Sequence, residues 1–176
     1  TEAAIMMQTV GQHGGAATPS INVNVFGLHP VVRHGTDEQK RRWLPPMIQG
    51  KDRAAFGVTE PNAGLDTSRI ETRAVRDGGH YVVNGRKMFT TTAQSANKFM
   101  LITRTTPREE CEKTLEGLTL FYTDFDRSCI EAREVEKFVR HAVDINAVFI
   151  DNLKIPVEDR IGEEGRGFYY LLDGLN

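Results

Sequence analysis

Short strand-like segments follow one another from residue 54 to residue 150, and this block constrains the fold more than any other feature of the sequence. The segments are rich in β-branched and aromatic residues, and turn signals such as Asp77-Gly78-Gly79 and Asn84-Gly85 separate them. About eight short strands at this spacing are typical of a small barrel or of two packed sheets. The predicted strands are Ala54–Val58, Ile70–Val75, Tyr81–Asn84, Lys87–Thr91, Phe99–Arg104, Leu118–Thr123, Ile130–Glu134 and Val148–Ile150.

Helical patterns lie on both sides of this block. Residues 2–12 fit one helix, and a capping-box pattern at Thr36 opens a second that ends at Gly50. Another helix begins near Phe168. Residues 20–34 are ambiguous, because local propensity favours a strand there while the family resemblance described below implies a helix.

The order of these elements predicts an α+β chain. N-terminal helices over 1–51 precede a small all-β barrel or two-sheet domain over 52–156, and residues 157–176 begin a C-terminal helical domain. The chain starts directly in a helix-like stretch, and its last residues form an apolar helical face with no partner. We therefore expect a fragment of a larger protein.

Composition excludes several classes of protein. The formal net charge of −2 over 176 residues creates no field that would attract nucleic acid, and no apolar run is long enough to span a membrane. Cys111 and Cys129 lack a disulfide-framework spacing, which is typical of the bacterial cytoplasm or the mitochondrial matrix. His29 and His34 do not share a helix face and no cysteine pair supports them, so no metal site is expected.

Two short loops contain the residues that are most informative about function. The first is Phe56–Asp66 and the second is Asn84–Thr92, and each combines an aromatic residue with hydroxyls and small residues. This mixture suits a flat ligand with an apolar face and a polar edge, such as a flavin. Taken singly, each loop is also compatible with an ordinary turn or an ordinary strand.

Both loops resemble the flavin-binding segments of the acyl-CoA dehydrogenase family. Three further motifs match that family in the same order, namely His34–Pro45, Val148–Pro156 and Gly165–Phe168. The resemblance implies an FAD cofactor, an acyl-CoA substrate, an electron-transferring flavoprotein as electron acceptor and a homodimer or homotetramer. It also implies an N-terminal helical domain, a β domain and a C-terminal helical domain.

The resemblance also assigns roles to individual residues. Substrate contacts fall on Leu65, Leu175 and Asn176, although many relatives carry Ser at position 65, and relatives most often have Trp at the position of Phe89. The catalytic base of the family is a Glu expected outside this chain, and Glu60 is interpreted as a turn or capping carboxylate. The residues implied to bind the cofactor are Phe56, Val58, Thr59, Gly64, Phe89, Thr90 and Thr91.

The reaction implied is α,β-dehydrogenation of an acyl-CoA thioester, with hydride transfer to flavin N5. Without its base the fragment alone is expected to be inactive. Acyl-CoA oxidases, flavin monooxygenases and nitroalkane oxidases share the architecture and stay open as alternatives. So do a non-catalytic binding or assembly module and an unrelated β-barrel protein.

Overall fold

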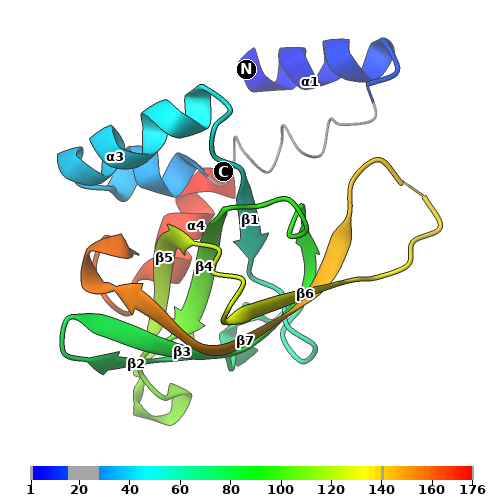
Figure 1. Cartoon of the computed structure of the whole chain (residues 1–176). Coiled ribbons are helices and arrows are strands. Elements are labelled where there is room, and N and C mark those ends of the chain that lie inside the picture. The colour runs from blue at the N-terminus through cyan, green and yellow to red at the C-terminus, as the bar shows by residue number, and fades with distance from the viewer. Residues whose placement is uncertain (1, 16–27, 140, 176) are drawn as a thin grey trace.

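The computed structural model describes residues 2–15, 28–139 and 141–175. Helices α1 (Glu2–Gln12), α3 (Asp37–Ile48) and α4 (Gly167–Leu175) flank a block of strands, and residues 28–34 are also helical (Figure 1). The predicted α+β class is confirmed. The strands are β1 Ala54–Gly57, β2 Arg73–Asp77, β3 His80–Thr91, β4 Lys98–Arg104, β5 Leu118–Asp124, β6 Ile130–Glu134, β7 Ile145–Pro156 and β8 Arg160–Ile161.

The strands form one curved sheet of eight described strands. Seven of them follow the order β6-β7-β3-β2-β4-β5-β8, and β1 pairs with β4 off this path. The sheet is open between β6 and β8, so it is neither a closed barrel nor two separate sheets. Most pairs are antiparallel, whereas β1 and β2 each lie parallel to β4. The β1–β4 pair brings the start of the block, at Ala54, beside Lys98.

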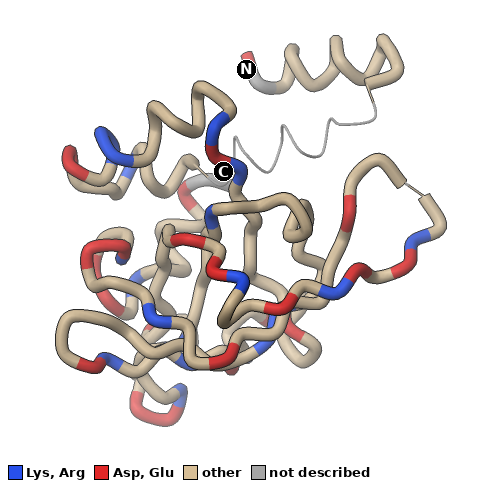
Figure 2. Tube along the Cα trace, in the orientation of Figure 1, with Lys and Arg blue, Asp and Glu red and all other residues tan. Residues whose placement is uncertain are grey.

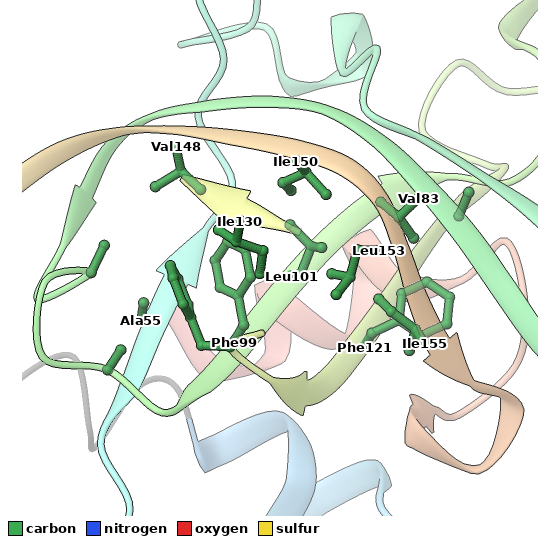
Figure 3. Close-up of a cluster of buried hydrophobic side chains, with 14 of the residues drawn as sticks. Ala55, Val83, Phe99, Leu101, Phe121, Ile130, Val148, Ile150, Leu153 and Ile155 are labelled. Carbon is green, nitrogen blue, oxygen red and sulfur yellow. The ribbon is translucent and has the colours of Figure 1, made fainter. Parts of the chain in front are cut away.

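The concave side of the sheet encloses the first apolar cluster (Figure 3). Phe99 and Leu101 of β4 face this cluster, while their neighbours Met100 and Ile102 face the other side. A strand that is buried on both faces requires an uninterrupted apolar run, which explains the sequence of β4.

Helices cover the opposite face through a second cluster. Trp43 of α3 packs edge-on against Tyr122 of β5, with ring centroids 5.1 Å apart, and Leu171 of α4 joins the same cluster. Gln39 completes the predicted capping box with Thr36, and its Nε2 also donates to the carbonyls of Glu158 and Arg160, at 2.7 and 2.8 Å. Helix α3 is therefore held to the rest of the fold by apolar and by polar contacts.

Several boundaries differ from the sequence prediction. The predicted turn at Asn84-Gly85 is wrong, because β3 runs without a break from His80 to Thr91. The opposing strand β7 carries the irregularity instead, at Asn152, where the backbone φ is +53°. The short strand β8 was not predicted. In the ambiguous stretch, residues 28–34 form a helix and residues 20–27 lie outside the described residues.

Candidate functional site

The fold brings the two candidate loops together. The first loop leaves β1 and crosses the second half of β3, where the Met88 N–H donates to the Thr59 carbonyl at 2.7 Å. One position earlier, the Lys87 ammonium donates to the Val58 carbonyl at 3.2 Å. Two segments about 30 residues apart in sequence thus lie side by side.

A buried ion pair fixes this junction. The Lys87 Nζ lies 2.7 Å from an Oε1 of Glu60, and Lys87 has no exposed surface at all. The Glu60 carboxylate also accepts the backbone N–H groups of Glu71 and Thr72, at 2.7 and 3.0 Å. Burial alone would raise the pKa of Glu60, but the charge of Lys87 and these hydrogen bonds hold that pKa below its ordinary value. Burial lowers the pKa of Lys87 to about 8, against the attraction of Glu60.

A β-bulge turns Phe89 outward. Lys87 pairs with Val148 and Thr90 with Asn146, so β3 holds one extra residue between these two pairs. Phe89 has φ +58° and a side chain that is 61% exposed. Such a backbone conformation is uncommon for a bulky residue and indicates that the neighbouring pairs impose it.

The threonines that flank this bulge differ in exposure. Thr90 is fully buried, and its hydroxyl has no hydrogen-bond partner in the part of the chain that the structure describes. Thr91 and Thr59 are half-buried, and within the described residues neither hydroxyl has a partner. Two hydroxyls that can donate or accept therefore lie close to Phe89 along the backbone, since Thr91 follows it by two residues and the Thr59 carbonyl accepts the N–H of Met88.

The remaining residues predicted to contact the cofactor or substrate differ in burial and in position. Phe56 and Val58 are half-buried against the second apolar cluster, so their side chains point toward the core. Leu65 is fully exposed at the tip of the first loop, and Gly64 beside it has open space around its Cα. Leu175 is the last residue of α4. Asn176 lies outside the described residues.

Sequence reasoning missed the role of Lys87. In β3 the side chains of alternate residues face the core, and Tyr81, Val83 and Lys87 all fall on that buried side. The alternation expected of a strand was therefore a signal that could have placed the lysine inward.

No helix among the described residues is long and apolar enough to cross a membrane. Across the same residues, no three His, Cys, Asp or Glu side chains gather where they could hold a metal ion.

Comparison with known proteins identifies the family to which this chain is similar. A model for the acyl-CoA dehydrogenase middle domain matches residues 55–153, more than half of the chain, and a model for the N-terminal domain of the same family matches residues 1–51. The chain is 38% identical over 145 residues to the short-chain specific acyl-CoA dehydrogenase of Clostridium acetobutylicum, an alignment that covers 81% of this chain and 37% of the relative.

Solved structures agree with this match. Butyryl-CoA dehydrogenase from Megasphaera elsdenii aligns with a TM-score of 0.81 at 29% identity, over 90% of this chain and 42% of that one. The prolyl acyl carrier protein oxidase AnaB aligns with a TM-score of 0.82 at 27% identity, over 89% of this chain and 41% of that one. The chain spans 33% to 42% of the length of the curated relatives first matched. Because both family models match, one over the N-terminal residues and one over the sheet, this chain belongs to the acyl-CoA dehydrogenase family.

Proposed function

We propose that the chain forms the flavin-binding part of an FAD-dependent oxidoreductase that introduces a double bond between Cα and Cβ of an acyl-CoA thioester. The observation that carries this proposal is the junction of the two loops. The Met88–Thr59 hydrogen bond and the Lys87–Glu60 ion pair join the loop that carries the exposed ring of Phe89 to the first loop. The hydroxyls of Thr59 and Thr91, one on each loop, have no partner among the described residues. Family membership supports the same assignment.

The residues present fit an isoalloxazine ring. Such a ring needs an apolar surface against its face and hydrogen-bond donors at its polar edge. Phe89 offers the apolar surface, while the hydroxyls of Thr59 and Thr91 offer donors. Phe56, Val58, Gly64 and Thr90 would contribute through their backbone, because the three side chains are turned inward or buried and Gly64 has none.

When bound, FAD supplies an acceptor for the hydride that leaves the β-carbon. The chain's own residues bind and orient this group and exclude water from one of its faces. Glu60 is not available as a base, since its carboxylate is buried and already satisfied by Lys87 and two backbone N–H groups. The base is therefore assigned to a part of the whole protein outside this chain. Leu65 is assigned to the acyl-CoA side of the site.

The electron acceptor separates two versions of this function. An electron-transferring flavoprotein is the proposed acceptor, as in a dehydrogenase, with a homodimer or homotetramer as the proposed assembly. The similarity to the prolyl acyl carrier protein oxidase supports a second version in which oxygen accepts the electrons. Oxygen consumption by the whole protein during turnover distinguishes the oxidase from the dehydrogenase.

The test of flavin binding is retention of the cofactor. The chain is purified with excess FAD, free cofactor is removed, and the visible absorbance of the protein is recorded. We expect a retained flavin band, weakened several-fold by Phe89→Ala because an aromatic contact of about 1 kcal/mol or more is lost. Thr91→Val should retain the flavin but shift its absorbance, because a polar contact is removed.

Ile48→Ala is the matched control, since Ile48 is another highly exposed apolar side chain and lies on α3. It should retain as much FAD as the unchanged chain. Equal flavin retention by Phe89→Ala and Ile48→Ala would contradict the assignment of Phe89. A folded chain that retains no flavin would contradict the proposal that this chain binds FAD.

A further inference from the structure

A buried asparagine joins the strand that carries Phe89 to the strand beside it. Asn146 of β7 has no exposed surface, and it pairs in the sheet with Thr90 of β3. Its Nδ2 donates to the Thr90 carbonyl at 3.1 Å, and its Oδ1 accepts the Nε2 of Gln94 at 2.7 Å. The Asn146 side chain therefore contacts both β3 and the turn that follows β3.

Asp144, which immediately precedes β7, completes a network with Asn146 and Gln94. One oxygen of its carboxylate accepts the Asn146 Nδ2 at 2.5 Å and the backbone N–H of Gln94 at 3.1 Å. Its backbone carbonyl accepts the N–H of Thr92 at 3.2 Å. The Gln94 Nε2 also donates to the carbonyl of Ala132 in β6, at 3.1 Å. The network thus ties β6, β7 and the end of β3 together.

Neutral donors hold the carboxylate of this network. Positive and negative side chains are interspersed along the whole chain (Figure 2). Within the described residues, however, no lysine or arginine forms an ion pair with Asp144. Hydrogen bonds from N–H groups to a carboxylate are roughly twice as strong as those between two neutral groups. Asp144 therefore acts as a hydrogen-bond acceptor that fixes its donors in place.

The network lies at a stretch of strained backbone. Phe89 has φ +58° and Thr92 has φ +63°, a conformation that is uncommon for residues with a bulky or β-branched side chain. These two residues bracket Thr90 and Thr91. Since neither residue type favours such a backbone, contacts around the stretch impose it. The hydrogen bonds to the Thr90 carbonyl and from the Thr92 N–H are two of these contacts.

We infer that Asn146 is a positioning residue for the proposed flavin site. The inference rests on the proposed function, and it names the residue that fixes the backbone of Thr90–Thr92 and hence the direction of the Thr91 hydroxyl. Asn146 does not itself contact the cofactor, because its side chain is fully buried and its amide is bonded at both ends. It acts through Thr91, the donor proposed for the polar edge of the ring.

The absorbance spectrum and the midpoint reduction potential of the bound flavin test this role. The chain is loaded with FAD, free cofactor is removed, and the potential is titrated against a reference dye. Asn146→Leu has a similar shape but can neither donate nor accept, so the Thr91 backbone is no longer held by β7. The variant should retain flavin with displaced absorbance bands and a lower potential. A misdirected donor stabilises the charge of the reduced ring less well.

Two further variants test whether the effect passes through Thr91. In a Thr91→Val background, Asn146→Leu should displace the bands no further, because the hydroxyl on which it acts is already absent. Gln94→Ala removes one bond to Asn146 from an exposed position, and it keeps the test informative if Asn146→Leu does not fold. It should displace the bands in the same direction by a smaller amount.

Asn84→Leu is the matched control, because Asn84 bonds to β7 at the other irregularity of the same strand pair. Its Oδ1 accepts the Asn152 N–H at 2.8 Å, and its Nδ2 donates to the Asn152 Oδ1 at 3.2 Å. This variant should change only the urea midpoint and leave the flavin bands and potential as they are. If the Asn146 and Gln94 variants behaved in the same way, their role would be structural and the inference would be overturned.

Amide hydrogen exchange separates this inference from the proposed function. In the chain without flavin, Asn146→Leu should make the Thr92 N–H exchange about tenfold faster, since the carbonyl that accepts it is no longer held. Amides of β4 and β5 should keep their rates. An unchanged rate at Thr92 would overturn the inference even if flavin is retained. A folded, unchanged chain that retains no flavin would contradict the proposed function, and this inference with it.

Discussion

At the scale of single residues, the extra residue in β3 between Lys87 and Thr90 decides which side chains of the candidate site are exposed. Strand alternation would place Phe89 on the buried side of β3 together with Tyr81 and Lys87. The bulge shifts this alternation by one, so Thr90 is buried and Phe89 is exposed. The sequence predicted which residues make up the proposed site, and that assignment stays a prediction. It did not predict the bulge, because the bulge depends on pairing with β7 and on the Met88–Thr59 hydrogen bond.

The Glu60–Lys87 pair makes a prediction at the same scale. Glu60→Gln leaves the Lys87 charge buried without a partner, and we expect a loss of about 3–5 kcal/mol in the free energy of unfolding at pH 7. Urea denaturation measures this loss. Because the pKa of folded Glu60 is lowered, its stabilisation is present above the ordinary value of 4.5 and is lost as the pH falls through the folded pKa. The variant should therefore lose less of its remaining stability on acidification.

Glu131→Gln is the control for this experiment. Glu131 forms its ion pair with Arg133 on the exposed surface, where solvent screens the interaction. We expect no measurable change in the urea midpoint. A similar effect of the two substitutions would show that burial of the Glu60–Lys87 pair has no special role.

At the scale of elements, the sequence predicted strands better than it predicted the connections between them. Seven of the described strands overlap predicted segments, because β-branched and aromatic runs bounded by turn residues are local signals. The Asn84-Gly85 turn was wrong, because tertiary pairing with β7 on one side and β2 on the other overrides the local turn preference. The two-residue strand β8 is too short to carry a periodic signal.

Gly85 tests this explanation of β3. A Cβ at Gly85 would lie 2.5 Å from the Thr72 hydroxyl and 2.7 Å from the Thr72 Cα, so Gly85→Ala forces β3 away from Thr72, the residue that precedes β2. We expect a loss of about 1–3 kcal/mol in the free energy of unfolding. Gly79→Ala, in the adjacent turn, meets no atom within 4 Å and should stay within about 0.5 kcal/mol of the unchanged chain. Equal urea midpoints for the two variants would refute the close approach at Gly85.

At the scale of the whole molecule, the helical and sheet parts share one interface. Trp43 and Tyr122 pack at its centre, and the Arg42–Asp159 ion pair of 3.0 Å lies beside the Gln39 hydrogen bonds at its rim. We propose that the boundary near residue 51 separates segments of sequence rather than units that fold independently, because these contacts join α3 to the sheet.

Trp43 is the single tryptophan of the chain, so its fluorescence reports on this interface directly. Unfolding followed by tryptophan fluorescence and by far-ultraviolet circular dichroism should give the same urea midpoint, since the interface and the sheet are lost together. Gln39→Ala should lower both midpoints equally. A fluorescence transition that precedes the loss of the sheet signal would show that α3 detaches alone.

The parallel pairing of β1 with β4 has a consequence for the order of events during folding. We expect the β2–β3 hairpin, which closes through a short turn, to form early, and β1 to pair later, because its partner strand lies more than 40 residues away in sequence. The first loop follows β1 and reaches Met88 only once β1 has joined the sheet. We therefore expect the proposed flavin surface to be completed late, so that a flavin present from the start of refolding binds molecules that have already folded and does not accelerate their formation.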